Sequence, residues 1–336
     1  MDAELLDVKG TGPTVFALHR FARKGRKLLL YAHTDTVEPT EGWTLNPFAA
    51  TVRGSKIYGL GSWDMKGGLS AILEACRRLT KMDLQGELGV AFASDEELHS
   101  RGCDQLIRSG LLRGFDGAIS AEPTGLSSLE IGRRGRVVFE VNVTGRASHG
   151  AAYSRGVDAV VEASNLVTHL TKLNFRRWKK IKGTASVLAI EGGTEFLSVP
   201  DKCRLLLDRH LVPGETAESA LRQLLDFVRT LGSKARIRIA IKKRKTPYMA
   251  PYEISPNEAI VKAVRKASLL EVKKPKLSFG LSVADDNYLV TRAKIPTVTF
   301  GPDGGNYHAP DEYVDMPSVI AAANTYVKAG ALFLGS

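Results

Sequence analysis

Two hydrophobic patterns alternate along the first 120 residues. Short apolar runs such as LLLY (28–31) are typical of strands buried on both faces of a sheet. Residues 65–80 instead carry apolar side chains at helical spacing, and a second helix is expected over Cys103–Ser109. The segment 42–57 shows neither period and is expected to be irregular. Strands are expected over Thr14–Leu18, Lys27–Ala32, Glu87–Ala93 and Gly117–Ser120.

The pattern changes near residue 133. RVVFEVNVTG alternates strictly, as an antiparallel strand with one exposed face does, and the elements from there to Ala235–Ile241 follow a β-α-β-β-α-β order. After residue 246 strands and helices alternate again, ending in a helix over Pro317–Leu334. We therefore expect an α/β domain of residues 1–132 and 247–336, with a mostly parallel mixed sheet and helices on both faces. A ferredoxin-like α+β domain of residues 133–246 is inserted into it.

Length and composition agree with two domains. A chain of 336 residues exceeds one ordinary hydrophobic core, and 43% hydrophobic with 25% charged residues is typical of soluble globular proteins. No membrane-spanning run or signal peptide is present in the sequence. Three widely spaced cysteines suit neither a disulfide framework nor a paired-cysteine metal site, which favours a cytoplasmic location.

The net charge of +11 raises the question of nucleic-acid binding. Basic residues cluster at 174–180 and 234–245, but neither cluster has the signature of an RNA-binding module or a zinc finger. A solvated basic face that attracts anionic substrates is the preferred interpretation.

The first candidate metal ligand follows the apolar run 28–32. His33 and Asp35 are separated by one residue, so in a strand their side chains emerge on the same side. An imidazole with a supporting carboxylate suggests a metal ligand and the group that orients it. The alternative is a strand-end pair that only hydrogen-bonds locally.

Further carboxylates and one imidazole extend this pattern. A paired-metal site needs a bridging carboxylate and, for each ion, a histidine and a carboxylate, and zinc accepts both nitrogen and oxygen donors. Glu96 next to Glu97 allows one carboxylate to bind metal while the other takes a proton from water. The alternative is two acids favoured in the first turn of a helix. The candidate ligands are His33, Asp64, Glu97, Glu122 and His308.

Eight motifs follow one another along the chain: HTDTV, GLGSWDMKGG, SDEE, AEPT, GRASHG, SVPD, LDRHLVPGET and GPDGGNYHAPDEYV. In this order they resemble the motifs of one family of dizinc metallopeptidases and amidohydrolases. Its members include acetylornithine deacetylase, succinyl-diaminopimelate desuccinylase, glutamate carboxypeptidase and aminoacylase.

The resemblance implies a role for each matching residue. Asp35 would orient His33, Glu96 would be the general base, and a cis peptide would follow Asp64. His149 would reach from the inserted lid domain into a partner's active site and stabilise the oxyanion, so a homodimer formed through the lid is implied. One zinc would be held by His33 and Glu122, the other by Glu97 and His308, with Asp64 bridging both; cobalt or manganese can substitute.

The sequence departs from the family pattern at three places. His210 stands where many members have an arginine that grips the substrate carboxylate, and it has no bidentate fork. The neighbouring Arg209 faces the other side of the strand. Ser198 replaces an asparagine, and the usual N-terminal helix is not in this sequence, which questions whether Met1 is the natural start.

The expected activity is metal-dependent cleavage of an amide or peptide bond in a small N-acylated amino acid or short peptide, by a metal-activated water with Glu96 as base. His210 is the candidate contact for the substrate carboxylate. The alternative is a metal-binding or basic nucleic-acid-associated scaffold without turnover, which would have no use for a free base beside the ligands.

Overall fold

The computed structural model describes residues 1–272 and 275–335, and these divide into two compact units. The first unit comprises Met1–Arg133 and Glu253–Ser336, and the second comprises Arg134–Tyr252. The chain therefore leaves the first unit once and returns to it, so the second unit is an insertion.

A nine-stranded mixed sheet forms the centre of the first unit. Its order is β1-β2-β6-β3-β7-β17-β8-β15, with β16 pairing to β8. The four central neighbours β6, β3, β7 and β17 run parallel, whereas β1 and β2 add antiparallel strands at one edge. The strands are β1 (Asp2–Leu6), β2 (Thr14–Arg20), β3 (Arg23–His33), β6 (Gln85–Ala93), β7 (Gly117–Ser120), β8 (Ser128–Arg133), β15 (Tyr252–Glu253), β16 (Lys276–Gly280) and β17 (Thr297–Thr299).

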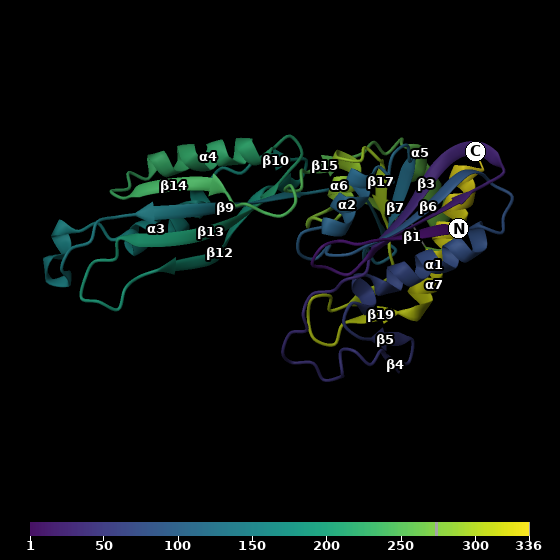
Figure 1. Cartoon of the computed structure of the whole chain (residues 1–336), viewed down its shortest axis with the longest axis horizontal. Coiled ribbons are helices and arrows are strands. Elements are labelled where there is room, and N and C mark those ends of the chain that lie inside the picture. The colour runs from purple at the N-terminus through teal and green to yellow at the C-terminus, as the bar shows by residue number, and fades with distance from the viewer. Residues whose placement is uncertain (273–274, 336) are drawn as a thin grey trace. The chain divides into compact units, whose positions relative to one another are not determined.

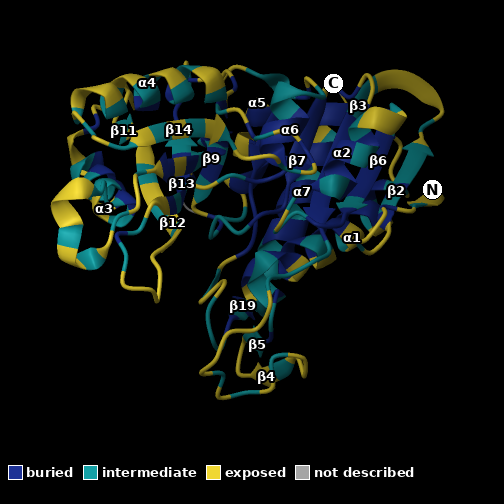
Figure 2. Cartoon of the chain, turned by 60° about the vertical axis from the view of Figure 1, so that its left-hand side comes forward, coloured by how far each residue is buried: buried dark blue, intermediate teal, exposed yellow. Residues whose placement is uncertain are grey.

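Helices cover both faces of this sheet. Leu28 of β3 lies against α7, whereas Tyr31, of opposite parity on the same strand, contacts Cys103 of α2. The last six residues of β3 are consequently all buried, and Figure 2 shows the darkest, most buried colour in the central strands. The helices of this unit are α1 (Gly67–Leu79), α2 (Arg101–Ser109), α5 (Ala259–Ser268), α6 (Asp286–Thr291) and α7 (Met316–Leu334).

A small antiparallel sheet, β18-β19-β5-β4, corrects one expectation. The segment 42–57 is not wholly irregular, because it includes one strand and the start of another. These strands are only two or three residues long, so no period of two could be recognised in the sequence. They are β4 (Thr51–Arg53), β5 (Lys56–Tyr58), β18 (Gly304–Gly305) and β19 (Tyr313–Asp315).

The helix expected from residue 65 begins later than its apolar spacing suggested. Ser62–Lys66 forms a separate turn, η1, in which Asp64 and Met65 have non-helical torsions, and α1 starts at Gly67. The Asp64–Met65 peptide is cis, as the resemblance implied.

The second unit folds as β9-α3-β12-β13-α4-β14, and its sheet order β12-β13-β9-β14 is antiparallel throughout (Figure 1). This is the ferredoxin-like arrangement that the alternating pattern predicted. Alternate residues of β9 and β13 pack against α3 and α4 in one core. The elements are β9 (Gly135–Thr144), α3 (Ala159–His169), β12 (Thr184–Gly192), β13 (Lys202–Leu211), α4 (Ala217–Thr230) and β14 (Arg236–Ile241), with short pieces η2 (Gly150–Arg155), η3 (Leu170–Lys172), β10 (Arg177–Trp178) and β11 (Ile181–Lys182).

Within residues 1–272 and 275–335, no helix combines the length and the hydropathy that crossing a bilayer requires.

Candidate metal centre

The candidate centre lies where parallel strands end. His33 is the last residue of β3 and pairs in register with Ala93, the last residue of β6. The segments that follow β6 and β7 therefore leave the sheet close to His33. These segments carry Glu96, Glu97 and Glu122.

Asp64 lies between two imidazoles that are 275 positions apart in the chain numbering, at 33 and 308. Its Oδ1 is 3.2 Å from His33 Nε2, and its Oδ2 is 3.3 Å from His308 Nε2. The same nitrogen of each imidazole faces a second carboxylate: Glu97 Oε1 is 3.0 Å from His308 Nε2, and Glu122 Oε1 is 3.9 Å from His33 Nε2. The five expected ligands thus come together as two groups of three that share Asp64.

These separations suit ligands of divalent ions. Two donors bound at about 2.0–2.2 Å to one tetrahedral ion lie roughly 3.3–3.6 Å from each other. The four nitrogen–oxygen distances, from 3.0 to 3.9 Å, bracket that value. One oxygen of Asp64 toward each group is the arrangement of a bridging carboxylate, so the residues present fit two metal ions.

The electrostatics of the cluster call for added positive charge. Burial and the charge of Asp64 raise the pKa of Glu122 to about 8. Contacts with Asp64 and Glu97 raise the pKa of His308 to about 10. Burial opposes charging of His33, but Asp64 and Glu122 outweigh it and raise its pKa well above the ordinary value. The carboxylates thus favour positive charge on both imidazoles, and divalent cations can supply the same charge.

Asp35 supports the cluster differently from the expectation. The main-chain oxygen of Asp35, at 3.0 Å, is the partner of His33 Nδ1, whereas its carboxylate lies 3.7 Å away. The carboxylate instead accepts the amide N–H groups of Glu96 and Glu97, both at 3.1 Å. Asp35 therefore holds the imidazole through its backbone and the two glutamates through its side chain.

Glu96 and Glu97 do not occupy the first turn of a helix, because α2 starts only at Arg101. They lie in the turn after β6, where Glu97 reaches His308. The Glu96 carboxylate makes no hydrogen bond or ion pair with any residue in the described part of the chain. Burial and the charge of Glu122 raise the pKa of Glu96 well above its ordinary value.

Glu312, which lies beside the centre, was not singled out from the sequence. The Glu312 carboxylate accepts the amide N–H groups of Gly61, Trp63 and Asp64. It stands four positions after His308 inside the quoted motif GPDGGNYHAPDEYV, but an acid in a motif gives no sign that its partners are amides 250 positions earlier.

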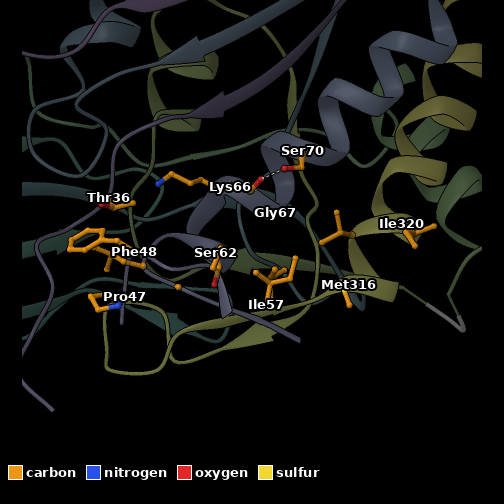
Figure 3. A pocket seen from close by; sticks show the side chains of 15 residues that line it. Thr36, Pro47, Phe48, Ile57, Ser62, Lys66, Gly67, Ser70, Met316 and Ile320 are labelled. Carbon is orange, nitrogen blue, oxygen red and sulfur yellow. Dashed lines mark hydrogen bonds between the residues drawn. The ribbon is translucent and has the colours of Figure 1, made fainter. Parts of the chain in front are cut away.

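A cavity of about 590 Å³ lies beside the turn that carries Asp64 (Figure 3). Its walls are mostly apolar, with Phe48, Ile57 and Met316 among the side chains drawn in Figure 3. Lys66 contributes a charged group, and burial lowers its pKa. Such a cavity suits an apolar group of substrate size.

The remaining candidates lie in the second unit. His149 is exposed, its Nδ1 accepts the N–H of Ala151, and its backbone pairs with Ser198. His210 Nδ1 lies 3.2 Å from a carboxylate oxygen of Asp208. The roles of His149 and His210 in the reaction stay predictions.

Arg209 cannot replace the missing arginine. Its guanidinium is buried, lies 2.6 Å from the Glu215 carboxylate and stacks on Phe175. It is thus part of the turn between β13 and α4.

A family model described as peptidase family M20/M25/M40 matches residues 29–330. The chain belongs to this family. It is therefore an enzyme of the M20 class, which hydrolyses peptide or amide bonds.

Solved structures share the M20 fold with this chain. An aminopeptidase PepT from Bacillus cereus is 18% identical with a TM-score of 0.78, covering 97% of this chain and 88% of its own. An M20 family metallo-carboxypeptidase from Sulfolobus solfataricus is 20% identical with a TM-score of 0.76, and the match covers 99% of this chain and 90% of the carboxypeptidase chain. A dinuclear metal-binding M20 peptidase from Bacillus subtilis is 17% identical with a TM-score of 0.74, and the match covers 99% of this chain and 88% of the Bacillus subtilis chain.

Proposed function

We propose that this M20 enzyme binds two zinc ions, for which cobalt or manganese can substitute, and cleaves the amide bond of an N-acylated amino acid or short peptide. The position of Asp64, one carboxylate oxygen toward each imidazole, carries the proposal. His33 and Glu122 would hold one ion, and Glu97 and His308 the other. The structurally similar M20 peptidase from Bacillus subtilis is described as binding two metal ions, which supports a two-metal site here.

Bound ions would polarise the scissile carbonyl and lower the pKa of a water molecule. The protein supplies the proton transfer. The Glu96 carboxylate has no hydrogen-bond or ion-pair partner among the described residues, and burial raises its pKa. It takes the proton from the attacking water and delivers it to the leaving nitrogen.

The inserted unit would act as the lid. We propose that it forms a homodimer and that His149 of one subunit donates a hydrogen bond to the oxyanion in the other. Three buried, unpaired cysteines suit the proposed cytoplasmic location.

Hydrolysis of a substrate panel tests the activity. N-acetyl and N-succinyl amino acids and dipeptides are assayed with added Zn²⁺ or Co²⁺, then after chelation and after metal is restored. The panel includes leucine and phenylalanine derivatives, because the cavity near Asp64 is apolar. Metal-dependent release of an amine supports the proposal; tight metal binding with no turnover on any compound favours the scaffold alternative.

The substrate preference of a His210 variant tests whether His210 contacts the substrate carboxylate. We expect the His210→Arg variant to raise kcat/KM for substrates with a free carboxylate, because arginine can bind it through two hydrogen bonds. The comparison uses matched methyl esters. If the ratio of kcat/KM for the acid to kcat/KM for the ester stays unchanged, His210 does not bind the substrate carboxylate.

A further inference from the structure

We propose that Glu312 is a positioning residue of the metal centre, which holds the Asp64 turn in place relative to the segment that carries His308. The inference rests on the proposed function, because it assigns Glu312 a task only if the cluster binds metal.

Three hydrogen bonds connect the Glu312 carboxylate to the turn. Oε2 accepts the amide N–H of Gly61 at 2.7 Å, and Oε1 accepts those of Trp63 and Asp64, each at 2.9 Å. The Glu312 main-chain oxygen also accepts the N–H of Gly59 at 2.9 Å. With 1% of its surface exposed, Glu312 has essentially no access to water that could replace these contacts.

The shape of the turn explains why an anion is needed there. Gly61 has a φ of 73°, in the left-handed region, and the amides after it converge on one point. Such a concave set of N–H groups binds anions, and a carboxylate has enough lone pairs for all three. A glutamine would turn an NH₂ group toward at least one of these donors.

Asp64 connects these contacts to the metal ligands. Its own N–H is one of the three donors, and its carboxylate lies between His33 and His308. Fixing its backbone therefore limits where its two carboxylate oxygens can lie relative to the imidazoles.

The segment after β17 makes other contacts with the same turn. Trp63 donates its indole N–H to the Pro302 carbonyl at 2.8 Å, and its ring meets Tyr307 edge-on. Glu312, four residues beyond His308, supplies the charged contact. Without that contact, the turn and the His308 segment can shift against each other.

The neighbouring residue offers a matched control. Asp311 accepts hydrogen bonds from Thr44 N, Thr44 Oγ1 and Leu45 N, at 3.0, 2.7 and 3.3 Å. It holds a loop that carries none of the proposed ligands. The two acids hold different loops, and Asp311 is also less buried than Glu312.

The experiment compares Glu312→Gln with Asp311→Asn in the full chain. Zinc stoichiometry and affinity are measured by competition with a chromophoric chelator, and folding by circular dichroism. Loss of a group that orients ligands weakens metal binding roughly 10–100-fold. We expect this for at least one ion in Glu312→Gln and no change in Asp311→Asn.

The outcomes separate this inference from the proposed function. A folded Glu312→Gln protein that binds both ions with wild-type affinity overturns the positioning role alone. A wild-type protein that binds no metal overturns the proposed function and, with it, this inference. If Glu312→Gln does not fold, Glu312→Asp, which keeps the charge on a shorter side chain, is measured instead; wild-type affinity in that variant also overturns the role.

Discussion

Glu96 and Glu97 show how structure separates two identical neighbours. Both amides are held by the Asp35 carboxylate, so the turn that presents them is fixed. Glu97 points to His308, whereas Glu96 is half-buried near Glu122 with no hydrogen bond or ion pair to a described residue. On this difference we base the proposal that Glu97 binds metal and Glu96 transfers the proton.

The Glu96→Ala variant tests that division. General-base catalysis typically contributes about 10²–10⁴-fold, so we expect kcat to fall by at least that range while metal content stays at the wild-type value. Glu97→Ala should instead lose bound metal. Steady-state hydrolysis and metal analysis check both variants. Wild-type turnover in Glu96→Ala, or loss of an ion from it, would contradict the assignment.

At the scale of elements, burial decided what could be predicted. The central strands β3, β6 and β7 are buried and appear in the sequence as apolar runs. Strand β1 was missed because its residues are almost all exposed. The start of α1 was placed too early, because apolar spacing does not report the torsions of Asp64 and Met65.

Gly68, the second residue of α1, yields a stability prediction. A Cβ on Gly68 would lie 2.2 Å from the carbonyl oxygen of Ala121, directly before Glu122. Because backbone must move to relieve this contact, we expect Gly68→Ala to lower the free energy of unfolding by about 1–3 kcal/mol. Gly12→Ala is the control, since a Cβ there meets nothing within 4 Å. Chemical denaturation measures both, and equal losses would refute the close-packing argument.

At the scale of the whole molecule, two units with separate cores share a net charge of +11. In the second unit, ionic contacts are partly buried. Asp208 is one example: burial raises its pKa, but hydrogen bonds with His210 and Arg136 outweigh this and lower the pKa below its ordinary value. A carboxylate whose folded pKa is lowered stabilises the protein above its unfolded pKa, and this contribution disappears as pH falls through the folded value.

The Asp208→Asn variant should therefore be less stable than wild type at about pH 6, and the difference should shrink as the pH falls below about 4. Unfolding free energies at several pH values give the comparison. Asp201→Asn is the control, because Asp201 is exposed and its carboxylate has no hydrogen bond or ion pair among the described residues. A difference that does not depend on pH would show that Asp208 acts through packing rather than charge.

The sequence alone determined the α/β pattern, the ferredoxin-like order of the second unit and the five candidate ligands. It could do so because periodicity and motif chemistry are local properties. Only the tertiary structure decided which atoms meet. The main-chain oxygen of Asp35 contacts His33, and the Asp35 carboxylate accepts two amide N–H groups. The Glu312 carboxylate accepts N–H groups of the turn that carries Asp64. Such contacts join residues far apart in the chain, and their geometry depends on backbone torsions and strand register, which no residue type encodes by itself.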